Sequence, residues 1–167
     1  MTPSDPNDPE VRNSLASLIA NVQKLLAMLQ ASKLDKFCNA IKQFEGWYIG
    51  SPSYRNNNPG NMRYGSYAAS YGAYAASASG FAIFRTYDAG MTCLKQFVTD
   101  CANQKIVWSH GGLTVLEYFA GKLNPATGKI EGGHAPSSDG NNPLRYATYV
   151  AKQTGVTVDT PLIQILS

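Results

Sequence analysis

A glutamate flanked by aromatic residues is the first candidate for chemistry in this sequence. Glu45 lies between Phe44 and Trp47, is followed by Gly46, and ends a segment with helical amphipathic spacing. Burial against aromatic carbon disfavours an ionised carboxylate, so we expect Glu45 to stay protonated near neutral pH. Such an acid can donate its proton to a glycosidic oxygen. If the helix instead frays before residue 45, the side chain is solvated and a poor acid.

An asparagine-rich loop follows the glutamate. Residues 54–63 read Tyr-Arg-Asn-Asn-Asn-Pro-Gly-Asn-Met-Arg, a combination that random loops rarely contain. Asparagine side chains fix loops by hydrogen bonding to the nearby backbone, and this turn preference explains part of the segment. The remaining amide donors and acceptors can bind the hydroxyl and N-acetyl groups of sugars. We therefore predict a rigid polar loop that can contact a carbohydrate.

The segments that must position these residues are mainly helical in pattern. A helix start at Ser32 and Asp35 precedes the apolar face that leads to Glu45. Residues 46–80 are rich in Gly, Asn, Ser and Tyr, which predicts loops and a short β-hairpin ending at 80–84. We expect the helical face next to Glu45 to be formed by Leu34, Phe37, Cys38, Ile41 and Phe44.

Three more helices are predicted after the hairpin. They run from Asp88 to about 103, from a capping box at 114–117, and from Asn142-Pro143 to Gly155. A loop rich in Gly and Pro, 124–141, separates the last two. The expected buried faces are Met91, Leu94, Phe97, Val98 and Cys101; Leu116, Phe119 and Leu123; and Leu144, Ala147 and Val150. The fold class is therefore mainly α, with a small lobe of loops and one hairpin.

The first 32 residues form a separate unit in this interpretation, before a catalytic domain at 33–167. Residues 1–8 predict a disordered tail, and a helix over 9–30 follows. Its heptad seam can dock on a partner or pair with a second copy, although we favour folding back on the same domain because three heptads are few. The seam consists of Val11, Leu15, Leu18, Val22, Leu25 and Leu29.

Composition excludes several classes of protein. A chain of 167 residues is too short for two full-sized catalytic domains. Its net charge is +3, and its Lys and Arg residues are scattered along the chain instead of forming basic runs, so we expect no nucleic-acid partner. We expect no membrane span, no metal site and no cofactor. Cys93 and Cys101 are about 12 Å apart on one helix, beyond the ~7 Å limit of a disulfide, so free buried thiols are expected. Without a signal peptide, synthesis in the cytoplasm is expected.

The order of motifs resembles phage and bacterial muramidases of the lysozyme-like superfamily. The matching segments are 44–46, 54–63, 80–84 and 87–90, followed by Ala135-Pro136, 141–143 and Tyr149-Val150. The resemblance covers about residues 37–167 and implies an α+β lysozyme-like fold with a cleft, Glu45 as general acid, and peptidoglycan as substrate. We expect substrate contacts from Tyr54, Arg55, Asn57, Asn58, Asn61, Arg63, Phe84, Tyr118 and Tyr149, although core packing is the commoner fate of Tyr118 and Tyr149.

The sequence departs from the family pattern in the 124–141 loop, which is longer than expected, and at His134, where an aromatic residue is commoner. A second carboxylate, which hydrolytic glycosidases usually need, is an open question. Asp88 and Asp139 are the candidates, although a helix cap and a turn explain them at least as well. If neither faces Glu45, the resemblance to lytic transglycosylases implies one glutamate acting as acid and then base, with an anhydro product.

Two other classes of function are compatible with the residues. A cell-wall amidase would need Cys38 or Cys101 as nucleophile and His134 as base, but both thiols are on predicted buried faces. A phage structural or wall-binding protein could keep the fold without the reaction. A muramidase would act on the cell wall, either in host lysis or from a virion. The helix at 9–30 could serve self-association or virion attachment.

Overall fold

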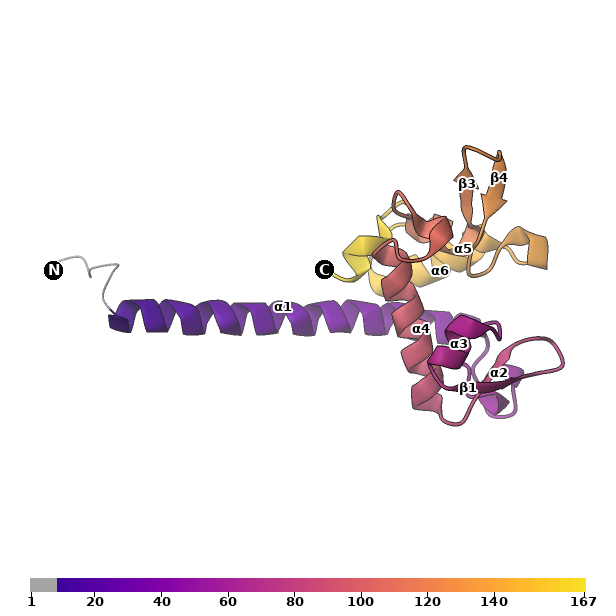
Figure 1. Cartoon of the computed structure of the whole chain (residues 1–167), viewed down its shortest axis with the longest axis horizontal. Helices are drawn as coiled ribbons and strands as arrows, with labels where there is room; N and C mark the ends of the chain where they lie inside the picture. The colour runs from indigo at the N-terminus through magenta and orange to yellow at the C-terminus, as the bar shows by residue number, and fades with distance from the viewer. Residues whose placement is uncertain (1–8) are drawn as a thin grey trace.

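The computed structural model describes residues 9–167, except the side chains of residues 27–32. The tail predicted over residues 1–8 lies outside the described residues. One long helix, α1 (Pro9–Phe44), projects from a globular part, and its C-terminal end enters that part (Figure 1). The mainly α class predicted from the sequence is confirmed, with two small antiparallel hairpins added to the helices.

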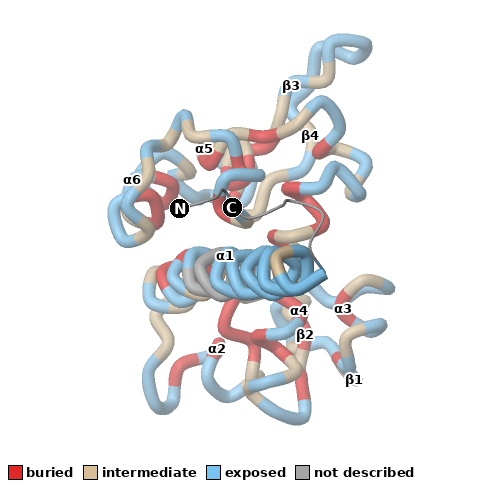
Figure 2. Tube along the Cα trace, turned by 90° about the vertical axis from the view of Figure 1, so that its left-hand side faces the viewer, coloured by how far each residue is buried: buried red, intermediate tan, exposed pale blue. Residues whose placement is uncertain are grey.

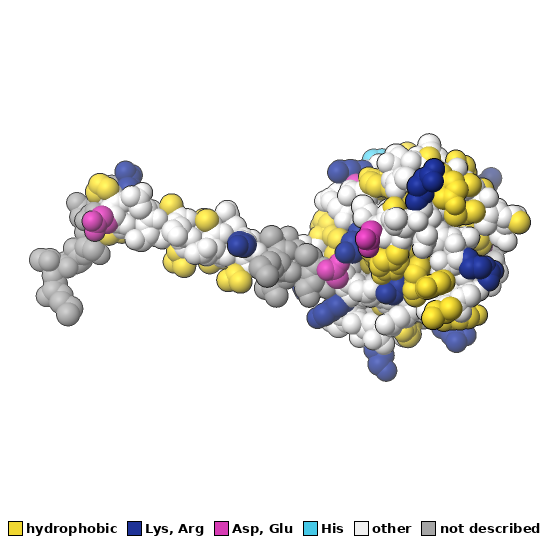
Figure 3. Space-filling view, turned by 90° about the horizontal axis from the view of Figure 1, so that it is seen from below, with side chains coloured by type: hydrophobic (Ala, Val, Ile, Leu, Met, Phe, Trp, Pro, Cys, Tyr) yellow, Lys and Arg dark blue, Asp and Glu magenta, His cyan; other side chains and the backbone are white. Residues whose placement is uncertain are grey.

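Helix α1 is continuous, so the predicted break near residue 32 was wrong. The segment contains no Pro or Gly between residues 10 and 45, and Ala, Leu, Lys and Gln favour helix, so no stop signal opposes the start signal at Ser32. Folding back of the first helix on the domain was also wrong. The large apolar side chains of its projecting part are about half exposed, and Figure 3 shows hydrophobic atoms along it. Self-association or attachment through this seam stays a prediction; the side chain of Leu29 is outside the described residues.

The globular part consists of two lobes on either side of α1 (Figure 2). The first lobe holds α2 (Pro52–Arg55), α3 (Ser66–Ser70) and the predicted hairpin of β1 (Ala73–Ala76) with β2 (Ala82–Phe84). Helix α4 (Tyr87–Ala102) then crosses α1 and leads to the second lobe (Figure 1). The two lobes are therefore joined by the crossing of α1 and α4, which contact each other.

The second lobe is built around α5 (Val115–Ala120) and α6 (Pro143–Thr154), which pack together, and α6 also packs on α1. A second hairpin, β3 (Lys122–Asn124) with β4 (Lys129–Glu131), stands in the segment predicted to be a loop. Three short 3₁₀ helices complete the chain: η1 (Val107–Ser109), η2 (Ser137–Asp139) and η3 (Leu162–Ile165).

Local end signals in the second lobe act as predicted. Thr114 and Glu117 form the capping box of α5, Asn142 accepts from the Arg145 N–H at the start of α6, and Gly155 ends α6 at φ +77°. The prediction of a buried core position was wrong for two leucines. Leu123 is 56% exposed because α5 ends at Gly121 and the chain turns into β3, and Leu144 is 56% exposed on the outer side of the first turn of α6.

The core contains most of the predicted helical faces. Phe37, Cys38 and Ile41 of α1 are fully buried, and Leu94, Val98 and Cys101 of α4 pack in the same cluster. All three cysteines are free and buried, as predicted. Among the described residues, no helix is long and apolar enough to cross a membrane.

Candidate active site

Glu45 directly follows the last residue of α1, and Gly46 ends the helix immediately after it. The Glu45 N–H still donates to the Ile41 carbonyl at 2.9 Å. Gly46 then adopts φ +69°, its N–H bonds to the Gln43 carbonyl, and the Trp47 N–H bonds to the Lys42 carbonyl. This pattern of two bonds around a left-handed glycine is the Schellman motif that terminates helices. The helix therefore does not fray before residue 45.

Two side chains hold the Glu45 carboxyl group from opposite lobes. The Tyr146 hydroxyl of α6 donates to Oε1 at 2.6 Å, and Asn61 Nδ2 donates to Oε2 at 2.6 Å. The Tyr146 ring is buried and stacks on Phe44 with centroids 4.0 Å apart. Burial raises the pKa of Tyr146 well above its usual value, and Glu45 adds to that shift, so the hydroxyl keeps its proton. The Glu45 side chain remains 19% exposed, which leaves it a path to a ligand.

The asparagine-rich loop divides into structural and pocket-lining residues. Asn58 is fully buried, donates to the carbonyls of Met62 and Ala82, and accepts from the Met62 N–H, all at 2.9 Å. Asn57 donates to the carbonyls of Phe84 and Arg85. These bonds hold the loop against β2 and the residue after it, which is compatible with the predicted rigid loop, but they use the side chains of both asparagines for backbone contacts. Asn61, at φ +45°, points to Glu45 instead.

Glu45 opens into a pocket of about 140 Å³ between the lobes. Residues from the asparagine-rich loop and β-hairpin form one wall, and residues 134–141 form the other. A second pocket of about 180 Å³ adjoins it and shares Asn61, Arg63 and His134 with it. The first pocket is lined by Glu45, Asn61, Arg63, Phe81, His134, Ala135, Asp139 and Asn141. This arrangement can present the carboxyl group of Glu45 to a polar molecule held in the pocket.

The two candidates for a second carboxylate occupy different places. Asp139 lines the same pocket as Glu45, and its Oδ2 lies 3.3 Å from Arg63 Nη2 of the opposite lobe. Arg63 also donates to the Ser79 carbonyl and lies over the Phe81 ring. Asp88 is exposed in the first turn of α4 and does not line the pocket of Glu45. Of the two, only Asp139 shares the pocket of Glu45.

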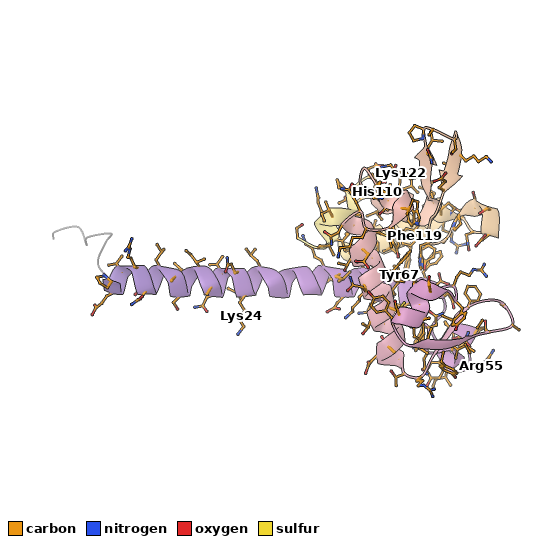
Figure 4. All side chains as sticks on the ribbon, viewed as in Figure 1. Lys24, Arg55, Tyr67, His110, Phe119 and Lys122 are labelled. Carbon is orange, nitrogen blue, oxygen red and sulfur yellow. The ribbon has the colours of Figure 1, made fainter. Side chains whose placement is uncertain are left out.

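Several residues predicted to contact substrate do not line the Glu45 pocket. Tyr118 and Phe84 are buried in the core, because they are on inward faces of α5 and β2. Tyr54 packs against Trp47, and Arg55 bonds to the Gly50 carbonyl at the outer edge of the first lobe (Figure 4). Tyr149 bonds to Gln43 and lines a separate, open groove beside Phe44 of about 730 Å³.

Sequence reasoning missed Tyr146, the hydrogen-bond donor to Glu45, and several of the pocket residues, including His134. Tyr146 is 101 positions from Glu45 in the chain, and nothing in its helical position distinguishes it from a core tyrosine. His134 was considered only as a departure from the family pattern and as the base of an alternative cell-wall amidase. The two glycines before it, Gly132 and Gly133, were a sequence signal of an unusual backbone at this point. In the structure, a Cβ at Gly133 would lie 2.6 Å from the Gly121 nitrogen. Glycine at 133 lets the loop reach α5 and place His134 in the wall.

The three cysteines are buried in the core, which changes the chemistry of their thiols. Burial raises the pKa of Cys93 and Cys101 to about 12, and it raises the pKa of Cys38 further. Thiols with such pKa values supply little thiolate at neutral pH, which argues against a cysteine nucleophile. Among the described residues, no group of three His, Cys, Asp or Glu side chains comes together to hold a metal ion.

The buried His134 makes a pH dependence of stability expected. Burial lowers the pKa of His134 below the ordinary value of 6.5, although the nearby Glu45 carboxylate opposes this shift. Below about pH 6.5 the unfolded chain therefore binds a proton that the folded chain does not, so the free energy of unfolding falls as pH decreases. Thermal unfolding at about pH 5 and pH 7 should show this loss, and His134→Phe should reduce it. An unchanged pH dependence in the variant would contradict the assignment.

The fold and the pocket define a mainly α protein that presents the carboxyl group of Glu45 between two lobes, beside a loop held by asparagine side chains. No protein-family model, curated protein or solved structure matches the chain.

Proposed function

We propose that the protein is a peptidoglycan-cleaving glycosidase with a lysozyme-like fold, and that Glu45 is its general acid. The observation that carries the proposal is the placement of Glu45 at the end of α1, held by Tyr146 and Asn61 at the edge of an interlobe pocket. General acids of glycosidases sit beside the scissile bond in such grooves. The motif order described above favours the β-1,4 bond between N-acetylmuramic acid and N-acetylglucosamine.

The partners of Glu45 suit a group that gains and loses a proton. A tyrosine hydroxyl and a carboxamide each carry donor and acceptor atoms, so they can hydrogen bond to both the acid and the carboxylate. In the first step Glu45 would donate its proton to the glycosidic oxygen as the bond from that oxygen to C1 breaks. Arg63 and Asn141 add polar groups to the pocket walls, where sugar hydroxyl and acetamido groups can bind.

Asp139 keeps both reaction outcomes open within this proposal. It lines the pocket of Glu45, as hydrolysis with two carboxylates requires, but it is paired with Arg63. Mass spectrometry of fragments released from purified cell walls distinguishes the outcomes. Anhydro sugar ends would indicate transglycosylation with Glu45 as acid and base, and reducing ends would indicate hydrolysis. Release of peptides with intact glycan strands, or no release at all, would refute the proposed function.

Removing the Tyr146 hydroxyl should slow the reaction without unfolding the protein. Tyr146→Phe keeps the ring stacked on Phe44 but takes away the donor to Glu45 Oε1, so we expect kcat to fall about 10-fold. Tyr149→Phe is the matched control on the same helix, because its hydroxyl bonds to Gln43 outside the pocket. Equal rates for the two variants in a cell-wall turbidity assay would show that the Tyr146 bond has no part in catalysis.

The proposal includes a location and a partner. The substrate would be the bacterial cell wall, on which the protein would act in host lysis or from a virion. The mild net charge of +3 is compatible with binding an anionic polymer.

A further inference from the structure

His134 is a buried histidine whose ring forms part of the pocket wall beside Glu45. Its side chain is only 4% exposed. Its backbone N–H donates to the Tyr118 carbonyl at 2.8 Å, and its ring stacks on the Tyr118 ring with centroids 5.4 Å apart. The rings of Phe119 and Tyr146 meet it at interplanar angles of 78° and 77°. The imidazole is therefore fixed on several sides and has one defined orientation toward the pocket.

One ring nitrogen of His134 has no hydrogen-bond partner among the described residues. Nε2 is buried and lies 3.9 Å from Glu45 Oε1, which is too far for a direct hydrogen bond. A buried polar atom without a partner destabilises the fold, so such atoms are rare and usually have a functional or solvent explanation. Asn61 Oδ1, on the other side of the Glu45 carboxyl group, is also buried without a partner. Among the described residues, two of the three buried side-chain atoms without a partner thus belong to neighbours of Glu45, and the third is the Tyr118 hydroxyl.

This inference rests on the proposed function: we propose that His134 Nε2 hydrogen bonds to the attacking oxygen of the reaction and positions it next to Glu45. This oxygen belongs to a hydroxyl group of the sugar or to water. Two atoms 3.9 Å apart can both bond to one oxygen placed about 2.8 Å from each. Both residues line the same pocket. Because Nε2 is buried in the unliganded protein, the oxygen would reach this position through a small movement of the pocket wall when a ligand binds. His134 would then be a catalytic residue that contacts the nucleophile.

The chemistry of the step balances with a neutral imidazole. Glu45 first gives its proton to the leaving glycosidic oxygen, and the C1–O bond breaks. The resulting carboxylate then takes the proton of the attacking hydroxyl group while that oxygen forms its bond to C1. A neutral imidazole that carries its proton on Nε2 donates a hydrogen bond to the same oxygen and keeps that proton. The proton of the attacking hydroxyl group is therefore free to pass to Glu45. Burial lowers the pKa of His134, which keeps the ring neutral at neutral pH.

Two substitutions of His134 separate this role from packing. His134→Phe keeps an aromatic ring on Tyr118 and removes the unpaired nitrogen, so its thermal stability at neutral pH should equal or exceed that of the wild type. Its kcat on purified cell walls should fall about 10- to 100-fold, with a much smaller change in KM, because the nucleophile is no longer held. His134→Gln should recover part of kcat, because its amide can donate to the same oxygen.

The control and the contrary results are well defined. His110→Phe changes the other histidine of the chain, which is exposed in the second lobe near Lys122, and it should leave kcat unchanged (Figure 4). Wild-type kcat in His134→Phe would overturn the proposal. A variant that loses stability together with activity, with no recovery by His134→Gln, would also overturn it and make His134 a packing residue. The end groups of the wild-type products identify the attacking oxygen, since anhydro ends come from a sugar hydroxyl and reducing ends from water.

A binding measurement distinguishes failure of this inference from failure of the proposed function. Nitrogen-15 NMR can follow the imidazole of His134, assigned by its loss in His134→Phe, while an oligomer of N-acetylglucosamine is added to the Glu45→Gln protein. A shift of His134 without one of His110 places the sugar in the pocket even if no wall is cleaved. Cleavage by the wild type with no response of either histidine, and no effect of His134→Phe, would refute the role of His134 alone.

Discussion

Glu45→Gln is expected to lower the rate of cell-wall clearing by about 10²- to 10⁴-fold, the range that one general acid or base contributes. Glutamine has nearly the same shape and can still bond to Tyr146 and Asn61, but it cannot donate a proton to a glycosidic oxygen. The folded state should therefore persist while the reaction stops. Initial rates of turbidity loss with purified cell walls, at equal protein concentration, measure the effect.

A second glutamate provides the control for this substitution. Glu131→Gln makes the same chemical change in β4, where the side chain accepts from Asn124 in the hairpin and lies outside the Glu45 pocket. Its rate should stay within about twofold of the wild type, because surface substitutions change little. Equal clearing by Glu45→Gln and the wild type would remove Glu45 as the acid. No clearing by any of the three proteins would favour a wall-binding or structural role.

Gly90→Ala is expected to give the largest loss of stability among substitutions that add one methyl group near the site. Gly90 is in the first turns of α4, and a Cβ there would lie 1.9 Å from the Asn57 carbonyl oxygen and 2.9 Å from Pro59 Cδ. The first atom belongs to the backbone, so the helix and the asparagine-rich loop must move apart. We expect about 2–3 kcal/mol of destabilisation, which lowers Tm by about 4–12 °C in a chain of this size.

The same movement should reduce activity, because residues 57–60 lead directly to Asn61 and its bond to Glu45. A displacement of about 1 Å near reacting groups can lower a rate about 100-fold. Gly65→Ala is the control for stability: its φ is extended, nothing lies within 4 Å of the added Cβ, and Tm should change little. A Tm for Gly90→Ala equal to that of Gly65→Ala would contradict the described packing of α4 on the loop.

The parts of the fold that follow from local chemistry could be predicted from the sequence. The capping box at Thr114 and Glu117, the Asn142 cap and the Gly155 stop each depend on residues within one helical turn. The first hairpin was predicted from the Gly-, Asn-, Ser- and Tyr-rich composition of its segment, and the buried face of α4 from the helical period. The second hairpin was missed because its short strands lie at and within a segment rich in Gly and Pro, a composition that predicts a loop.

Local signals failed where two neighbouring features compete or where a side chain faces solvent by tertiary placement. Ser32 and Asp35 indicate a helix start, but no helix-breaking residue precedes them, so α1 continues through. Leu144 has the spacing of a core residue, yet its side chain is on the outer side of the first turn of α6. Such outcomes depend on which elements pack together, and one sequence does not contain that information in a local pattern.

The candidate site shows the same division. Glu45 could be found because an ionisable residue on an apolar helical face is visible in the sequence, and Asn61 and Arg63 because their loop has a distinctive composition. The loop also misled, because the Asn57 and Asn58 side chains are used by the backbone of the hairpin. Tyr146 comes to Glu45 from another lobe, so only the three-dimensional arrangement identifies it.

The most direct test of the central claim is a crystal structure of the Glu45→Gln protein with a bound oligomer of N-acetylglucosamine. We predict that the sugar chain passes through the pocket between Asn61 and His134, with a glycosidic oxygen within hydrogen-bonding distance of the residue at position 45. An oligomer bound in another groove, such as the one beside Tyr149, with position 45 out of its reach, would contradict the account.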